Sequence, residues 1–126
     1  MLFPTEALAR DHREMEAALD CLAGSLASAS LDIEAFRRAH RLCIRHYASE
    51  EAFLIRLGTL DAALAAKLRG QHEEALELAA RLEEALAAGQ SRDGIYLARR
   101  FLAIAQHNII EEERDVFPLA PDIQPE

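Results

Sequence analysis

This sequence of 126 residues has little of what builds sheets, disulfide frameworks or aromatic cores. It contains no tryptophan, only 6% aromatic residues, 4 prolines and 2 cysteines, and its β-branched residues are few. Alanine, leucine and glutamate are abundant instead, which favours helices over strands. Because 51% of the residues are hydrophobic, the chain can bury a core of its own. We therefore predict an all-α fold in a single domain, residues 1–126.

Basic residues are also scarce, since 14 Lys and Arg stand against 22 Asp and Glu and give a formal net charge of −8. Such a charge repels phosphate backbones and anionic lipid heads, so we expect neither a nucleic-acid nor a membrane partner. No stretch approaches the roughly 18 apolar residues of a membrane span, and no basic region precedes an apolar run at the N-terminus. We expect a soluble cytoplasmic protein. Cys21 and Cys43 have no CxxC spacing and are expected to be buried or half-buried thiols.

Short polar segments divide the chain into four predicted helices. The segments SASLD, GTLD and GQSRDG combine Gly or Ser with residues that cap helices. The helices are predicted at about 5–28, 32–57, 60–88 and 92–117. Because the connections are short, consecutive helices should be antiparallel, which favours an up-down-up-down four-helix bundle.

The four helices form two similar hairpins, each carrying histidines in its core-facing rows. The row of the first helix is Leu8, His12, Met15, Leu19, Leu22 and Leu26. Sixty positions later the third helix repeats it as Leu68, His72, Ala75, Ala79, Leu82 and Leu86. The row of the second helix is Phe36, Ala39, Cys43, His46, Glu50, Phe53 and Leu57. His107, which is 61 positions after His46, falls in a row of the fourth helix with Leu97 and Ile104.

Imidazoles and carboxylates inside a bundle need partners, because an ionised carboxylate buried alone is strongly unfavourable. His46 and Glu50 are one helical turn apart, so both can reach one point of the interior. Iron, zinc, manganese and copper accept such ligands, and four His with two Glu suit two metals better than one. The alternative is that each histidine is a core residue hydrogen-bonded to its neighbours. His40 lies about 120° around the helix from His46 and is expected at the surface.

Four motifs in this chain resemble those of the hemerythrin family, also called the HHE cation-binding domain. They are DHREME at 11–16, HYASEEAFL at 46–54, QHEEALEL at 71–78 and HNIIEEERDVFP at 107–118. The resemblance covers almost the whole chain. It implies an oxo- or hydroxo-bridged centre of two iron ions, or of another divalent metal, in a four-helix bundle. It further implies His12, His46, His72 and His107 as terminal ligands, with Glu50 as a bridging carboxylate.

The second bridging carboxylate is either Glu112 or Glu111. Glu111 keeps the four-residue spacing of His46 and Glu50, whereas Glu112 keeps the five-residue spacing found in the oxygen-carrying members of the family. The offset between the second and fourth helices rises from 61 to 62 after the histidine, which favours Glu112. A π-bulge near residues 108–112 would absorb the inserted residue and turn Glu112 inward. Glu51 and Glu113 are expected to face solvent or the helix edge.

Leu76 stands where the oxygen-carrying members have a fifth histidine, so the chain resembles the iron-centre repair and nitric-oxide-linked members more closely. Tyr47, Glu73 and Glu77 are candidates for substitute or supporting roles near that position. The resemblance implies a protein that binds or reduces dioxygen, nitric oxide or peroxide, in oxidative or nitrosative stress or in iron-centre repair. One alternative is an iron-binding sensor or reservoir without catalysis, and another is a metal-free helical module that binds a protein. The sequence identifies no redox or protein partner.

Overall fold

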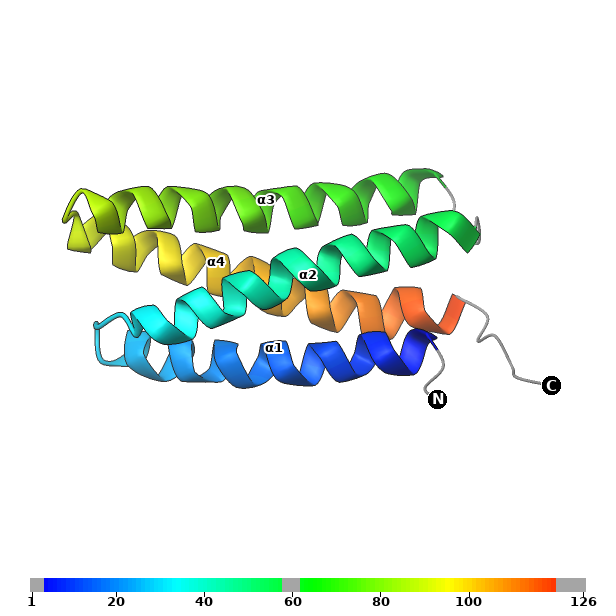
Figure 1. Ribbon diagram of the computed structural model, residues 1–126, viewed down its shortest axis with the longest axis horizontal. Helices are drawn as coiled ribbons and strands as arrows, with labels where there is room; N and C mark the ends of the chain where they lie inside the picture. The colour runs from blue at the N-terminus through cyan, green and yellow to red at the C-terminus, as the bar shows by residue number, and fades with distance from the viewer. Residues whose placement is uncertain (1–3, 58–61, 120–126) are drawn as a thin grey trace.

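Four long helices form a bundle in the computed structural model, which describes residues 4–57 and 62–119 (Figure 1). They are α1 (Pro4–Ala27), α2 (Ile33–Leu57), α3 (Ala62–Ala87) and α4 (Ser91–Glu111). A π-helix, η1 (Glu112–Val116), and a 3-10 turn, η2 (Phe117–Leu119), continue α4. The described residues contain no strand, which confirms the predicted all-α fold. The GTLD segment and the predicted start of the third helix fall on residues 58–61, outside the described residues.

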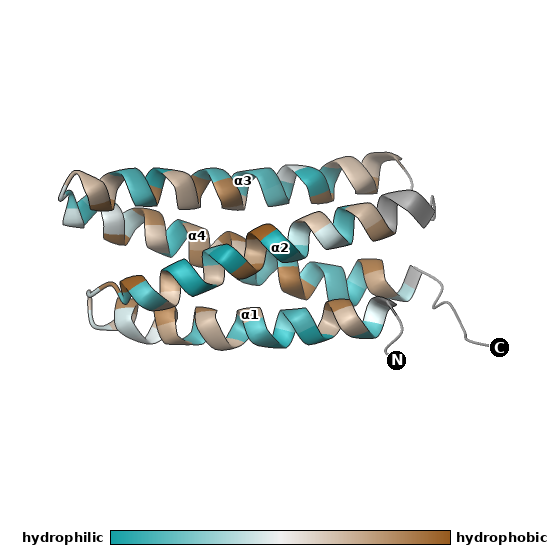
Figure 2. Cartoon of the chain, in the orientation of Figure 1, coloured by the Kyte–Doolittle hydropathy of each residue, from teal (hydrophilic) through white to brown (hydrophobic). Residues whose placement is uncertain are grey.

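Consecutive helices run in alternating directions, as predicted for an up-down-up-down bundle (Figure 1). The α1–α2 and α3–α4 connections lie at one end, which we call the loop end. The start of α1 and the end of α4 lie at the other end, which we call the terminal end. Hydrophobic and hydrophilic residues alternate along every helix, as expected of amphipathic helices that share one core (Figure 2).

The helices stop and start where the sequence places capping residues. Gly89 (φ 72°) and Ala29 (φ 55°) adopt the left-handed conformation just after α3 and α1, and in each case the next amide donates to a carbonyl five residues earlier. Asp32 caps α2, because its Oδ1 accepts a hydrogen bond from the Ala35 amide at 3.0 Å. These stops set the register of each helix and therefore the height at which each histidine lies.

Within residues 4–57 and 62–119, the core is divided into two unequal apolar clusters. The main cluster contains most of the predicted rows, from Met15 to Leu26 on α1 and from Ala75 to Ala85 on α3. The small cluster consists of Leu68 and Val116 with the half-buried Phe53, Leu64 and Phe117. Along their helices, Glu50, His72 and Glu112 lie between residues of the main cluster and residues of the small cluster.

Several surface predictions can be compared directly. Cys43 is buried, but Cys21 is exposed, so the expectation that both thiols are at least half-buried is wrong for Cys21. His40 lies at a helix edge, half-buried and stacked on Phe36 with 5.6 Å between ring centroids. None of the described helices is long and apolar enough to cross a membrane.

Candidate metal centre

Five side chains from three helices and η1 converge in the interior, and we call them the inner donors. They are His12, His46, Glu50, His72 and Glu112. Each is at most 2% exposed. His46 and Glu50 converge because they are one turn apart on α2, and the others arrive at the same height because of the register of their helices. Suitable atoms of four of them, all but His72, lie within 4.8 Å of one another.

The two inner carboxylates each face imidazoles in two directions. Glu112 turns Oε1 toward His12 Nε2 at 2.9 Å and Oε2 toward His72 Nε2 at 2.9 Å. Glu50 turns Oε2 toward His46 Nε2 and Oε1 toward His72 Nε2, both at 3.2 Å. Both carboxylates therefore separate the His12 and His46 side of the centre from the His72 side. His12, His46, Glu50 and Glu112 form one cluster that could hold a cation, and His72 faces the other oxygens of both carboxylates.

Three further acids hold the outer nitrogens of these imidazoles, and we call them the outer acids. The contacts are His12 Nδ1 with Glu113 Oε2 at 2.8 Å, His46 Nδ1 with Asp11 Oδ2 at 3.2 Å, and His72 Nδ1 with Glu51 Oε2 at 2.8 Å. An imidazole that donates its Nδ1 proton outward can present the Nε2 lone pair inward. A carboxylate behind a histidine is the usual support of a metal-bound imidazole, because it fixes the ring and raises its basicity.

Without a cation, the close contacts between nitrogen and oxygen require protons. Burial disfavours the charged form of His46 and His72, but the carboxylates of Glu112 and Glu50 outweigh this and raise the pKa of each imidazole to about 10. The metal-free centre therefore holds imidazolium ions at neutral pH. A bound cation would replace these protons at the same inward nitrogens.

The two inner glutamates also fit a cation. Burial and the neighbouring Glu112 carboxylate raise the pKa of Glu50. Burial also disfavours the charged form of Glu112, but its hydrogen bonds with Glu50 and with the three imidazoles outweigh this and lower its pKa. Glu50 Oε1 lies close to His72 Nε2 but outside hydrogen-bonding geometry, and it has no hydrogen-bond partner. A buried carboxylate oxygen without a partner is unfavourable, and a cation would satisfy it. The residues present therefore fit a bound metal.

The structure places His107 outside the centre, so the prediction that it faces the interior is wrong. Its side chain is 60% exposed and its Nε2 contacts Glu111 Oε2 at 2.8 Å. The cause is the position of the π-helix, which begins at Glu112 instead of lying between His107 and Glu112. In an α-helix, residues five apart differ by about 140° around the axis, so Glu112 inside puts His107 outside.

Glu111 is buried but belongs to a separate polar cluster on the α3–α4 side. It accepts hydrogen bonds from Lys67 and Gln71, and Gln71 in turn accepts one from Asn108 at 2.8 Å. The hydrogen bond with Lys67 is the main reason that the pKa of Glu111 is lowered. Of the two candidates for the second bridging carboxylate, the structure thus brings Glu112 to the centre and keeps Glu111 away from it.

Aromatic rings support two of the imidazoles. Tyr47 lies flat against His72, with 3.9 Å between centroids and 6° between planes, and Phe117 stacks on His12 at 5.2 Å. Tyr47 therefore has a supporting position, as the sequence suggested. Leu76 packs at the edge of the main apolar cluster, and Glu73 and Glu77 are exposed.

The outer acids were missed from the sequence, where Glu51 and Glu113 were expected to face solvent or the helix edge. One signal could have found them, because each outer acid is the immediate neighbour of an inner donor. The pairs are Asp11 with His12, Glu50 with Glu51, and Glu112 with Glu113. Adjacent helical residues point about 100° apart, so one can face the interior while the other reaches along the interface to the next helix.

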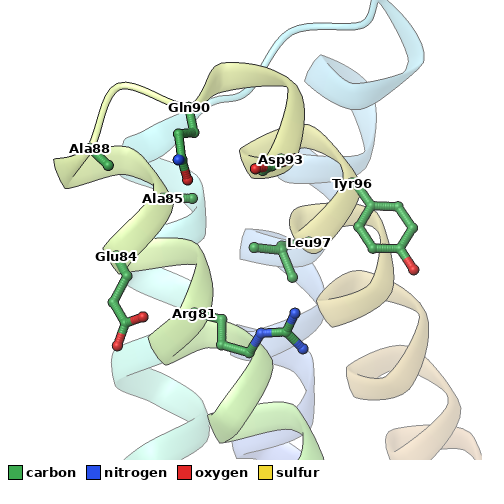
Figure 3. A pocket seen from close by; sticks show the side chains of 8 residues that line it. All are labelled: Arg81, Glu84, Ala85, Ala88, Gln90, Asp93, Tyr96 and Leu97. Atoms are coloured by element: carbon green, nitrogen blue, oxygen red, sulfur yellow. The ribbon is translucent and has the colours of Figure 1, made fainter.

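A surface hollow at the loop end is not part of this centre. It lies between α3 and α4 and is lined by Arg81, Glu84, Ala85, Ala88, Gln90, Asp93, Tyr96 and Leu97 (Figure 3). None of these residues is an inner donor or an outer acid.

Comparison with known proteins agrees with this geometry. The family model described as the hemerythrin HHE cation binding domain matches residues 4–120, which include every inner donor and outer acid. No curated protein and no solved structure matches the chain. The family match and the buried His and Glu cluster together fit a metal-binding module.

Proposed function

This chain belongs to the hemerythrin family of HHE cation-binding domains, and from that premise we propose that it is a non-haem di-iron protein that binds or reduces dioxygen, nitric oxide or peroxide. The observation that carries the proposal is the pair of buried carboxylates, Glu50 and Glu112, each placed between imidazoles on two sides. Two bridging carboxylates with terminal imidazoles are a donor set that iron accepts.

The two proposed iron positions would use different donors. His12 and His46, with Glu50 Oε2 and Glu112 Oε1, would hold the first. His72, with Glu50 Oε1 and Glu112 Oε2, would hold the second. Two bound iron ions would supply the redox changes that reduction of a small ligand requires. The second position receives fewer protein donors from the described residues, which leaves room for an external ligand.

The protein itself contributes orientation and exclusion of water. The outer acids hold each imidazole with its Nε2 toward the centre. Burial of the inner donors keeps bulk water out, which strengthens every electrostatic interaction between them. Leu76 offers no metal ligand, so the fifth histidine of the oxygen-carrying members has no counterpart at that position.

A second candidate function is an iron sensor or reservoir without catalysis. It is favoured by the origin of the inner donors, which come from α1, α2, α3 and η1. Since the complete site exists only in the folded bundle, metal binding would add directly to folding stability. Iron occupancy would then be sensed as a change in the order of the bundle.

Metal analysis of protein purified without chelator tests the proposal. We expect about two iron ions per chain, with the near-ultraviolet absorption of an oxo-bridged pair. A spectral change when nitric oxide, peroxide or oxygen is added to the reduced protein would support reactivity, and a stable spectrum would favour the sensor or reservoir. Protein that takes up no iron after reconstitution would contradict both functions.

A further inference from the structure

One outer acid differs from the other two in its contact with an arginine. Glu113 Oε2 accepts the Nδ1 proton of His12 at 2.8 Å, and the same oxygen accepts a hydrogen bond from Arg13 Nη2. Two donors therefore share one carboxylate oxygen. Because Arg13 is adjacent to His12 on α1, this arrangement depends on a single turn of helix packed against η1.

The corresponding oxygens of the other outer acids are not shared with a basic side chain. Arg69 lies 4.0 Å from Glu51, but it faces Oε1 and not the Oε2 that binds His72. Within residues 4–57 and 62–119, Asp11 forms an ion pair with His46 and with no arginine or lysine. The imidazole of His12 thus has an environment of its own among the three.

We propose that Arg13 is a positioning residue that acts through Glu113 on His12, weakening the donation of this imidazole to the bound metal and raising the reduction potential of the centre. The proposal rests on the di-iron function proposed above. Arg13 pairs with Glu16 and Glu113, neither of which is an inner donor, so its influence must pass through the outer acid.

The direction of the change in reduction potential follows from how Arg13 and His12 share the negative charge of Glu113. A carboxylate that accepts the Nδ1 proton makes the imidazole more electron-rich, and an electron-rich ligand stabilises the oxidised metal. The guanidinium takes part of the charge of Glu113 and so weakens its pull on that proton. Removing Arg13 should strengthen the hydrogen bond between Glu113 and His12 and stabilise ferric iron.

Arg13 is also accessible from outside. It is 58% exposed and lines a groove between α1 and α4 with Glu16, Gln106, Ile109 and Ile110. Glu16 competes with Glu113 for the guanidinium, since its Oε1 lies 2.7 Å from Arg13 Nη2. Because solvent screens an exposed pair, we expect a smaller effect than the roughly 10–100-fold typical of losing an outer carboxylate itself.

The test compares Arg13→Gln and Arg13→Lys with the matched control Arg45→Gln. Arg45 is 63% exposed on α2 and pairs with Glu14 at 3.6 Å, so it resembles Arg13 in exposure but contacts no outer acid. Spectroelectrochemical titration of the iron-loaded proteins gives the reduction potential. Proton NMR of the zinc-loaded proteins gives the chemical shift of the His12 Nδ1 proton, which reports the strength of its hydrogen bond without any turnover.

For Arg13→Gln, the ratio of oxidised to reduced iron at a fixed applied potential should rise roughly threefold to tenfold, and the His12 Nδ1 proton should move downfield. Arg13→Lys should restore most of both values, and Arg45→Gln should change neither. If wild type binds iron but Arg13→Gln behaves like Arg45→Gln, or its potential rises, this inference is overturned while the di-iron function stands. A wild type that binds no metal would overturn both.

Discussion

Replacing His72 with alanine tests whether the inner donors bind the metal. The same replacement at His107 tests the histidine that lies outside them. His72 is buried between Glu50, Glu51 and Glu112 and stacked on Tyr47. Truncation leaves buried carboxylate oxygens without their partner and an unfilled space beside the tyrosine ring. His107→Ala is the matched comparison, because it removes the same side chain from an exposed position on α4.

The expected loss can be worked out from the charge of the imidazole. In the metal-free protein, the pKa of His72 is raised from 6.5 to about 10. At pH 7 the stabilised imidazolium therefore contributes on the order of 4 kcal/mol to the free energy of unfolding, fully present below pH 6.5 and lost as the pH rises through 10. His107→Ala removes only a contact of an exposed side chain, worth less than about 1 kcal/mol.

Thermal unfolding and metal titration measure the two variants. At pH 7, metal-free His72→Ala should unfold roughly 10–20 °C below wild type, and His107→Ala within about 4 °C of it. His72→Ala should bind Fe(II) or Co(II) at least about 100-fold more weakly, since it loses a direct ligand and not only its support. His107→Ala should bind both metals as wild type does.

Equal losses from the two variants would refute this reasoning. If His107→Ala lost metal as severely as His72→Ala, His107 would be a ligand and the π-turn would lie upstream of Glu112. If neither variant lost metal, the metal would not be bound by the inner donors.

Three other predictions address the carboxylates and the protons. Glu112→Gln should reduce metal affinity at least about 100-fold in isothermal titration, because it removes the negative charge between the imidazoles. Glu111→Gln should leave the affinity unchanged, and the reverse order would contradict the assignment of Glu112 to the centre. Metal-free wild type should lose stability in urea unfolding as the pH rises from 6.5 to about 10, because His46 and His72 have raised pKa values; a gain would contradict those values. Metal-loaded protein should instead release metal as the pH falls, since protons compete for the same nitrogens, and constant occupancy down to pH 4 would count against imidazole ligation.

The fold could be read from the sequence because its signals are local and repeated. The rows of α1 and α3 have the same spacing, and residues such as Asp32 and Gly89 mark where helices begin and end. These features set length and register, and length and register place His12 and His72 at the same height. The GTLD segment before α3 carries the same kind of signal but lies outside the described residues.

The exposed position of His107 could not be predicted from the sequence, because it depends on where α4 accommodates one extra residue. A comparison of α2 with α4 shows that one residue is inserted after His107, but it does not show on which side of Glu112 the π-turn lies. Packing of the whole helix decides, because turning His107 inward would also rotate the rest of α4, including the buried Phe101 and Ala105. Such long-range constraints are absent from a local pattern. The contacts of the Glu51 and Glu113 carboxylates with histidines depend in the same way on which helices are neighbours.

The uneven division of the core has a consequence for the protein before it acquires metal. At the loop end, leucine, methionine and phenylalanine side chains hold the helices together whether or not iron is present. Toward the terminal end, the described side chains form only a small apolar cluster beside the buried charged groups of the inner donors. A newly made chain should therefore fold from one end, with amides near Met15 and Leu82 protected from hydrogen exchange and those near Glu112 still exchanging. The proposed metal would complete the other half, so a shortage of that metal would leave a partly open molecule that proteases can recognise.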